Sequence, residues 1–213
     1  MTNFIPIFPL SIVVYPGETL NLHIFEERYK ELITECYAEK KSFGIPPVLK
    51  EHISELGSMV DITEIVEIHS NGTMDVRVEG VGIFRVLEII KHVPDKLFSG
   101  AIVNHLDNET NRRHALMRYV IASIRELHRL LKVNKDFKKP DELLVSYDVA
   151  HHAGLNMEEE YELLGLLRED QRLEYLKRHL QKTLPVAAGI ETLKDKIQLN
   201  GHFRELKGFN LDL

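Results

Sequence analysis

The spacing of apolar residues changes near the middle of this 213-residue chain, and this change limits the possible folds more than any other feature. Between residues 73 and 79, even positions are apolar and odd positions polar, as in a half-buried strand. After residue 107 apolar residues recur at steps of four, four, three and four, as on one helix face: Leu116, Val120, Ile124, Leu127 and Leu131. The sequence therefore predicts an α+β protein, with a β domain over residues 1–107 and a helical domain over residues 108–213.

Short apolar runs predict strands in the first half. The clearest pattern lies between residues 60 and 80, and further strands are predicted at 4–8, 12–15, 20–24, 83–90 and 98–105. Pro16-Gly17 favours a tight turn, because proline presets φ and glycine accepts positive φ. One helix is predicted over residues 26–41, with this buried face: Tyr29, Leu32, Ile33 and Cys36.

Asn71-Gly72 predicts a hairpin between the two strands of the 60–80 region. Opposed residues share a face of the sheet, so Ile68 must oppose an even-numbered apolar residue. A two-residue turn fails this test, whereas a three-residue loop over residues 70–72 sets Ile68 against Met74. The same register sets Val66 against Val76. We therefore predict the three-residue loop, with Gly72 left-handed and forming a bulge.

The second half predicts helices at residues 109–133, 141–153, 157–167 and 169–183, with a polar, lysine-rich break at 132–140. Pro185 is expected to end the 169–183 helix. A weaker helix is expected over 187–199, broken by Asn200-Gly201 and followed by an irregular tail.

Charge and cysteine content restrict the function. The chain has 33 acidic and 27 basic side chains and a formal charge of −6, which argues against a general nucleic-acid binder. The N-terminus does not resemble a secretory signal, and no run approaches the roughly 20 apolar residues of a membrane span. Cys36 is the only cysteine, which excludes an intrachain disulfide. A cytoplasmic location is expected.

Several blocks, in order, resemble the Lon N-terminal (substrate-binding) domain family. The opening FPLSIVVYPG at residues 8–17, with LNLHIFEERY at 20–29, is similar to the start of that family. The later blocks are FGI at 43–45, LGSMV at 56–60, VEGVGIFRV at 78–86, the segment 146–155, LLGLL at 163–167 and QRLEYL at 171–176. The chain after Pro185 departs from the family pattern.

The resemblance implies a PUA-like β-barrel or sheet domain of roughly six strands with one helix, followed by a helical bundle. In full-length Lon proteases this region captures unfolded or tagged proteins and passes them to an ATPase motor. The residues that most resemble the family are Pro16, Gly17, Arg28, Tyr29, Glu79 and Gly80. We interpret them as mainly structural, because residues that define a fold are not automatically its binding site.

The residue patterns favour a protein without catalytic chemistry. The chain contains no Gly-x4-Gly-Lys-Ser/Thr phosphate-binding loop, so we expect neither ATPase nor protease activity from this stand-alone member. The eleven histidines lack metal-ligand spacing, and His151-His152 points its rings to different faces. We interpret the histidines as solvated or singly hydrogen-bonded and Cys36 as a buried, inert thiol. No catalytic residue, metal or cofactor is expected.

One basic cluster leaves an alternative open: Lys132, Lys135, Lys138 and Lys139. PUA-like folds include RNA binders, but acidic neighbours dilute this cluster, and a solvated loop between helices is favoured.

We therefore predict an adaptor that captures unfolded or extended protein segments, with a separate ATPase or protease as a candidate partner. The candidate surfaces are an exposed sheet edge and the groove between the β domain and the helices. The alternative is a PUA-like RNA-binding module. A small enzyme comes third, and it would need a deep pocket with convergent polar groups.

Overall fold

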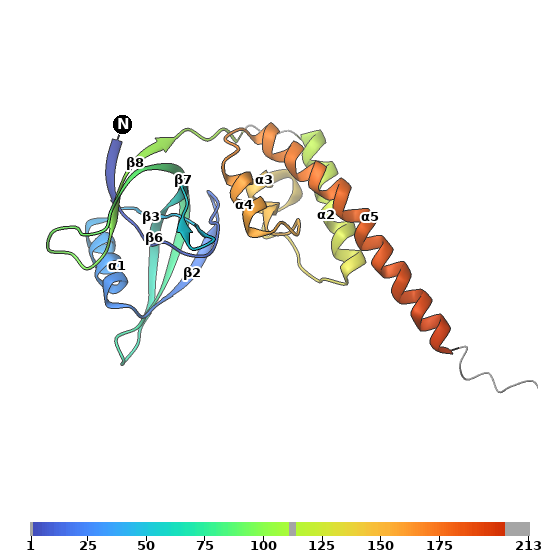
Figure 1. The fold of residues 1–213 in the computed structure, drawn as a ribbon, viewed down its shortest axis with the longest axis horizontal. Coiled ribbons are helices and arrows are strands. Elements are labelled where there is room, and N and C mark those ends of the chain that lie inside the picture. The colour runs from blue at the N-terminus through green and yellow to red at the C-terminus, as the bar shows by residue number, and fades with distance from the viewer. Residues whose placement is uncertain (1, 111–113, 203–213) are drawn as a thin grey trace, which may run out of the picture.

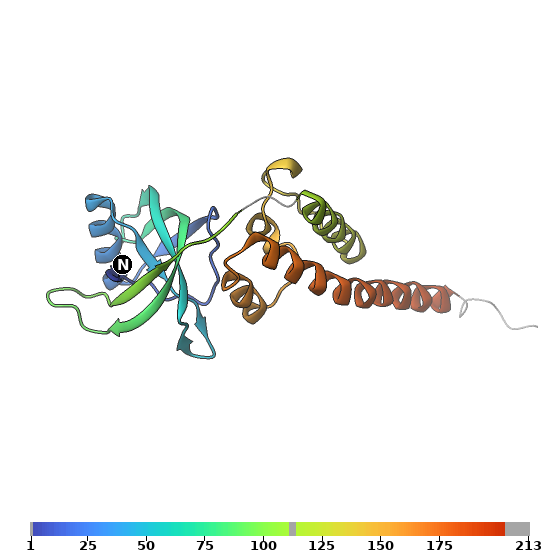
Figure 2. The same cartoon turned by 90° about the horizontal axis from the view of Figure 1, so that it is seen from above.

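The computed structural model of the protein describes residues 2–110 and 114–202. The strands and one helix form one end of an elongated molecule, and the remaining helices form the other end (Figure 1). The last helix extends away from the sheet along the long axis (Figure 2). None of the described helices combines the length and apolar character that a membrane crossing requires.

An antiparallel sheet has the strand order β1-β8-β7-β6-β3, with β2 also paired to β7. Its strands are β1 (Thr2–Pro6), β2 (Thr19–Ile24), β3 (Phe43–Ile45), β6 (Leu56–Ile68), β7 (Met74–Ile90) and β8 (Gly100–Leu106). A bridge between Ile7 and Gly44 brings the end of β1 beside β3 and curls the sheet toward a barrel. A separate two-stranded ribbon contains β4 (Val48–Leu49) and β5 (His52–Ile53). The α+β class is confirmed.

Two of the predicted strands differ from the structure. Residues 12–15 form a loop in which Val13, Val14 and Tyr15 are buried. An apolar run indicates burial but does not specify a strand partner. The run at 83–90 is not a separate strand but the continuation of β7. Gly80 and Gly82 lie just before this run. They face a register shift between Met59 and Val60 of β6, which bends the pairing of β6 with β7 without ending it.

The predicted hairpin loop is confirmed. Ile68 is paired with Met74, His69 N–H donates to the Thr73 carbonyl at 2.8 Å, and Gly72 is left-handed at φ +79°. The predicted pairing of Val66 with Val76 is wrong, since Ile65 takes that place. Register shifts on both sides of Ile65 interrupt the alternation in β6, so a parity count cannot be carried along that strand.

Helix α1 (Glu27–Glu39) packs its predicted face against the sheet, with Tyr29, Leu32, Ile33 and Cys36 buried. Lys40 ends the helix in a left-handed conformation (φ 52°). Burial, reinforced by the nearby Glu35 carboxylate, raises the pKa of the Cys36 thiol to about 11. The thiol is therefore protonated at neutral pH.

The helical part contains α2 (His114–Leu131), the short η1 (Asp141–Leu143), α3 (Ser146–Ala150), α4 (Met157–Leu164) and α5 (Glu169–His202). Its core is continuous with the sheet, because Val13, Tyr15 and Ile83 belong to the same buried cluster as the helix residues. The division into domains at residues 107 and 108 therefore stays a prediction.

The helix boundaries correct several predictions. Glu109 does not begin a helix: it forms an isolated bridge with Arg168, and its N–H donates to the Leu167 carbonyl at 2.8 Å. The predicted 141–153 helix is instead η1 and α3, separated by the extended Leu144 and Val145. Pro185 lies inside α5, since the helix is packed on both sides of it.

The packed residues around Pro185 are Leu184, Ala187 and Ala188. Helix α5 also continues through the predicted break at Asn200-Gly201. The irregular tail predicted beyond it lies outside the described residues from 203 onward.

Candidate functional site at the junction of sheet and helices

The loop before β2 is held against β7 by backbone hydrogen bonds. Gly17 is left-handed (φ +83°), and its N–H donates to the Gly80 carbonyl at 2.7 Å. Gly80 N–H donates to the Glu18 carbonyl at 2.9 Å. A Cβ at residue 80 would lie 2.2 Å from the Tyr15 carbonyl oxygen, so only glycine fits there. Gly17 and Gly80 therefore fix the position of this loop.

Tyr15 connects the loop before β2 to the helical part. Its side chain is fully buried, its hydroxyl donates to the Glu160 carbonyl at 3.0 Å, and its ring stacks on Tyr147 at 4.9 Å between centroids. Glu18 Oε2 accepts from Tyr15 N–H at 2.9 Å and lies 3.1 Å from His151 Nε2. The other ring nitrogen, His151 Nδ1, lies 2.7 Å from Glu160 Oε1.

His151 is a cation held between two carboxylates. Burial by itself lowers its pKa, but the hydrogen bonds and charges of Glu160 and Glu18 outweigh that effect and raise the pKa from 6.5 to about 9. The imidazole is therefore protonated at neutral pH, and both of its N–H groups donate to carboxylates. The resulting ion triad joins the loop before β2 to α3 and α4.

A pocket of about 330 Å³ opens beside this triad. The loop before β2 contributes Pro16, Gly17 and Glu18, and the helical part contributes Tyr147, Asp148 and His151. The pocket therefore lies in the groove between the sheet and the helices. Its volume is at the lower end of the range of ligand pockets, large enough for a few side chains of an extended segment.

Three lysines between α2 and η1 give the pocket a positive wall: Lys135, Lys138 and Lys139. Lys139 Nζ lies 2.6 Å from Asp148 Oδ1. Neither Lys135 nor Lys138 forms an ion pair with any residue that the structure describes, and both side chains are exposed. The pocket can therefore receive a carboxylate without first breaking an ion pair at these two lysines.

His152 also lines the pocket but is neutral. Burial, reinforced by the positive charge of Lys135, lowers its pKa to about 4. Its Nδ1 atom is buried and has no hydrogen-bond partner within the described part of the chain.

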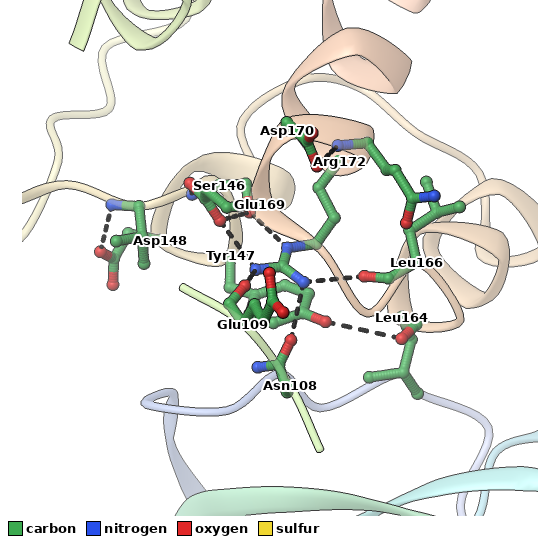
Figure 3. A network of polar contacts seen from close by, with 12 residues as sticks. Asn108, Glu109, Ser146, Tyr147, Asp148, Leu164, Leu166, Glu169, Asp170 and Arg172 are labelled. Atoms are coloured by element: carbon green, nitrogen blue, oxygen red, sulfur yellow. Dashed lines mark hydrogen bonds and ion pairs between the residues drawn. The ribbon is translucent and has the colours of Figure 1, made fainter. Parts of the chain in front are cut away.

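A buried arginine fixes the helices around the pocket (Figure 3). The Arg172 guanidinium is fully buried, donates to Glu169 Oε2 at 2.8 Å and lies over the Tyr147 ring at 4.2 Å. Its remaining N–H groups reach partners from three segments: Ser146 Oγ, Asn108 Oδ1 and the Leu166 and Glu109 carbonyls. All five N–H groups are thus satisfied, and they join the segment after β8 to α3 and α5.

The matches to known proteins agree with this architecture. Residues 5–182 match the family described as the ATP-dependent protease La (LON) substrate-binding domain. The chain belongs to this Lon substrate-binding family.

A Lon protease from Brevibacillus choshinensis is 23% identical over 189 residues, covering 81% of this chain and 24% of that protein. The chain thus spans about a quarter of the length of this relative. The Lon N-terminal domain protein of Xanthomonas campestris has a TM-score of 0.60 and 26% identity, covering 82% of this chain and 96% of that one. The N-terminal domain of Lon protease from the Mycobacterium avium complex has a TM-score of 0.59 at 15% identity, covering 84% and 98%.

The other motif residues of the chain do not line the pocket. Tyr29 is buried, and its ring stacks on Phe8 at 3.8 Å between centroids. Arg28 lies over the Tyr29 ring at 4.6 Å and binds Glu26 Oε2 through Nη2 at 2.6 Å. Glu79 pairs with Thr19 in the ladder between β7 and β2. The structure thus brings Pro16, Gly17 and Gly80 together and leaves Arg28 and Tyr29 on α1.

Sequence reasoning missed most of the junction. It treated the histidines as solvated or singly hydrogen-bonded, whereas His151 contacts two carboxylates. No local pattern could have shown this, because Glu18 and His151 are 133 positions apart. Arg172 did carry a signal, since Glu169 precedes it by three positions on the helix face that also holds Leu173 and Leu176.

Proposed function

We propose that this chain captures extended protein segments, and that the junction pocket holds an acidic side chain or a terminal carboxylate of the captured segment. The family match supports a substrate-recognition role. The single observation that carries the finer proposal is the pocket, where Lys135 and Lys138 stand opposite the loop that contains Pro16 and Gly17.

The chemistry of the pocket favours a carboxylate ligand. Two lysines without ion pairs among the described residues supply donors, and a charge-assisted hydrogen bond to a carboxylate is about twice as strong as a neutral one. Glu18 is already bound to His151 and Tyr15, so it does not compete for these lysines. An extended segment is favoured because a pocket of about 330 Å³ admits side chains and not a folded surface.

In this proposal the chain acts as an adaptor that delivers its cargo to a separate ATPase or protease and performs no catalysis itself. Both acids that line the pocket are already bound, Glu18 to His151 and Asp148 to Lys139, so neither carboxylate is free to act as a general base. RNA binding is not favoured, because acidic side chains interrupt the positive wall and the chain carries a formal charge of −6.

The test measures binding of fluorescent unstructured peptides that differ only in having three glutamates or three glutamines. We expect the chain to prefer the acidic peptide, and the double variant Lys135→Gln with Lys138→Gln to lose about tenfold in affinity for it. The matched control is Lys91→Gln with Lys182→Gln, which removes the same charge from exposed positions elsewhere. Equal losses in both double variants would show that the pocket is not the binding site.

A second measurement addresses the alternative function. A photo-crosslinking residue at Thr19, in the pocket wall, is expected to capture an unfolded acidic protein and not single-stranded RNA of equal charge. Capture of RNA alone would overturn the proposal in favour of the nucleic-acid alternative.

A further inference from the structure

Two histidines and one aspartate meet at the far end of the sheet, away from the junction pocket. One potential ligand atom from each of His23, His69 and Asp75 lies within 4.8 Å of the others. His23 Nδ1 is 2.6 Å from Asp75 Oδ1, and His69 Nε2 is 2.8 Å from Asp75 Oδ2. The sequence predicted no metal site, because spacing along the chain could not relate His23 to the hairpin.

Three neighbouring strands fix this cluster. His23 of β2 is the ladder partner of Asp75 in β7, so their side chains share a face of the sheet. His69 directly follows β6 and closes the hairpin through the hydrogen bond from its N–H to the Thr73 carbonyl. The Cα positions of all three residues are therefore set by backbone pairing, which organises the side chains before any ligand arrives.

We propose that His23, His69 and Asp75 form a binding site for a zinc ion. Two imidazole nitrogens and one carboxylate oxygen are ligands that Zn²⁺ prefers, whereas Mg²⁺ and Ca²⁺ prefer sites made of oxygen atoms alone. Three protein ligands leave a fourth position for water, as in open zinc sites.

The required adjustment is small. Zn–N bonds of about 2.0–2.1 Å place ligand atoms of a tetrahedral site about 3.3 Å apart, between the hydrogen-bonded contacts and the 4.8 Å limit of this cluster. The three side chains are partly exposed, at 56%, 32% and 39%, so their rotamers can adjust and the ion can enter from solvent.

A histidine that binds zinc usually donates a hydrogen bond from its other ring nitrogen to a carboxylate or carbonyl, and Glu67 offers such a carboxylate to His69. Its Oε1 atom lies 3.4 Å from Nδ1 of His69, on the side of the ring opposite Asp75. When Nε2 of His69 gives up its proton to bind the metal, the neutral tautomer carries its hydrogen on Nδ1, directed at Glu67. In His23 the metal would bind to Nδ1, so Nε2 keeps its hydrogen, and no carboxylate of the described residues forms an ion pair with Nε2.

The experiment titrates Zn²⁺ into the metal-free full chain by calorimetry, with Mg²⁺ and Ca²⁺ as comparison ions. We expect one Zn²⁺ per chain, at least about tenfold weaker binding in each of His69→Gln and Asp75→Asn, and about tenfold weaker binding in Glu67→Gln. The control His92→Gln changes an exposed histidine outside the cluster and is expected to bind as the parent chain does.

Two further measurements keep the result interpretable. Zn²⁺ is expected to shift the NMR signals of the His23 and His69 rings and to raise the Tm of the parent chain but not of Asp75→Asn. The Tm without metal shows whether each variant is folded. An absence of stoichiometric Zn²⁺ binding, or equal affinity in His69→Gln and the parent chain, would overturn the proposal.

Discussion

His151 Nε2 lies 3.1 Å from Glu18 Oε2, and this contact joins two segments that are 133 positions apart in the chain. Because Glu18 precedes β2 and His151 follows α3, the pair connects the sheet to the helices. Its charge state therefore affects how firmly the two parts are held together.

The stability conferred by His151 depends on pH. Its folded pKa of about 9 exceeds the ordinary value of 6.5, so its contribution is complete below about pH 6.5 and is lost as pH rises through 9. We expect His151→Gln to lower the free energy of unfolding at pH 6 by on the order of 2 kcal/mol, and this difference to shrink by pH 9.5. Urea unfolding across this range measures it, with His92→Gln as the control. A difference that stays constant with pH would contradict the ion triad.

Removal of Arg172 is expected to be strongly destabilising. Arg172→Met leaves the Glu169 carboxylate buried without its cation, which costs about 3–5 kcal/mol. The exposed Arg178→Met should cost less than about 0.5 kcal/mol. Urea unfolding compares the two variants. The double variant Arg172→Met with Glu169→Leu should recover part of the loss, because no buried charge then remains unpaired.

Gly80 and Gly82 in β7 form a matched pair for substitution by alanine. A Cβ at residue 80 would meet the Tyr15 carbonyl oxygen at 2.2 Å, whereas a Cβ at residue 82 would have no atom within 4 Å. Gly80→Ala is therefore expected to lower the free energy of unfolding by about 1–3 kcal/mol, and Gly82→Ala to change it by less than about 1 kcal/mol. Similar values for the two variants in urea unfolding would show that the loop before β2 is not held as described.

Pro185 offers a stabilising substitution. Within α5 it cannot donate the helical hydrogen bond, and its ring crowds the preceding turn. Pro185→Ala is expected to raise the Tm and to stabilise the chain by about 1–3 kcal/mol. Calorimetry measures the Tm, and Lys182→Ala, an exposed change one turn earlier, serves as the control. A lower Tm in Pro185→Ala would indicate that the packing of Ala187 needs the proline geometry.

Local sequence patterns predicted the structure correctly where a feature depends on residues of a single short segment. The face of α1 and the loop at residues 70–72 follow from side-chain periodicity and from the parity of strand pairing, and both are confirmed. The predicted pairing of Val66 with Val76 is wrong. A register shift depends on the neighbouring strand and cannot be seen in the alternation of apolar and polar residues along one strand. The predicted helix end at Pro185 is wrong for a similar reason: the packing of Leu184 and Ala187 outweighs the local cost of a proline in a helix.

The sequence by itself determined the α+β class, the family resemblance and the helix face of α1, since these depend on residues that are close together in the chain. Only the tertiary structure decided that His151 lies between Glu18 and Glu160, that Lys135 and Lys138 line a pocket, and that His23 meets Asp75. The physical reason is that charges and ligands act over a few ångströms in space. Residues that are far apart in the chain come within that range only when the core has set the positions of the strands and helices.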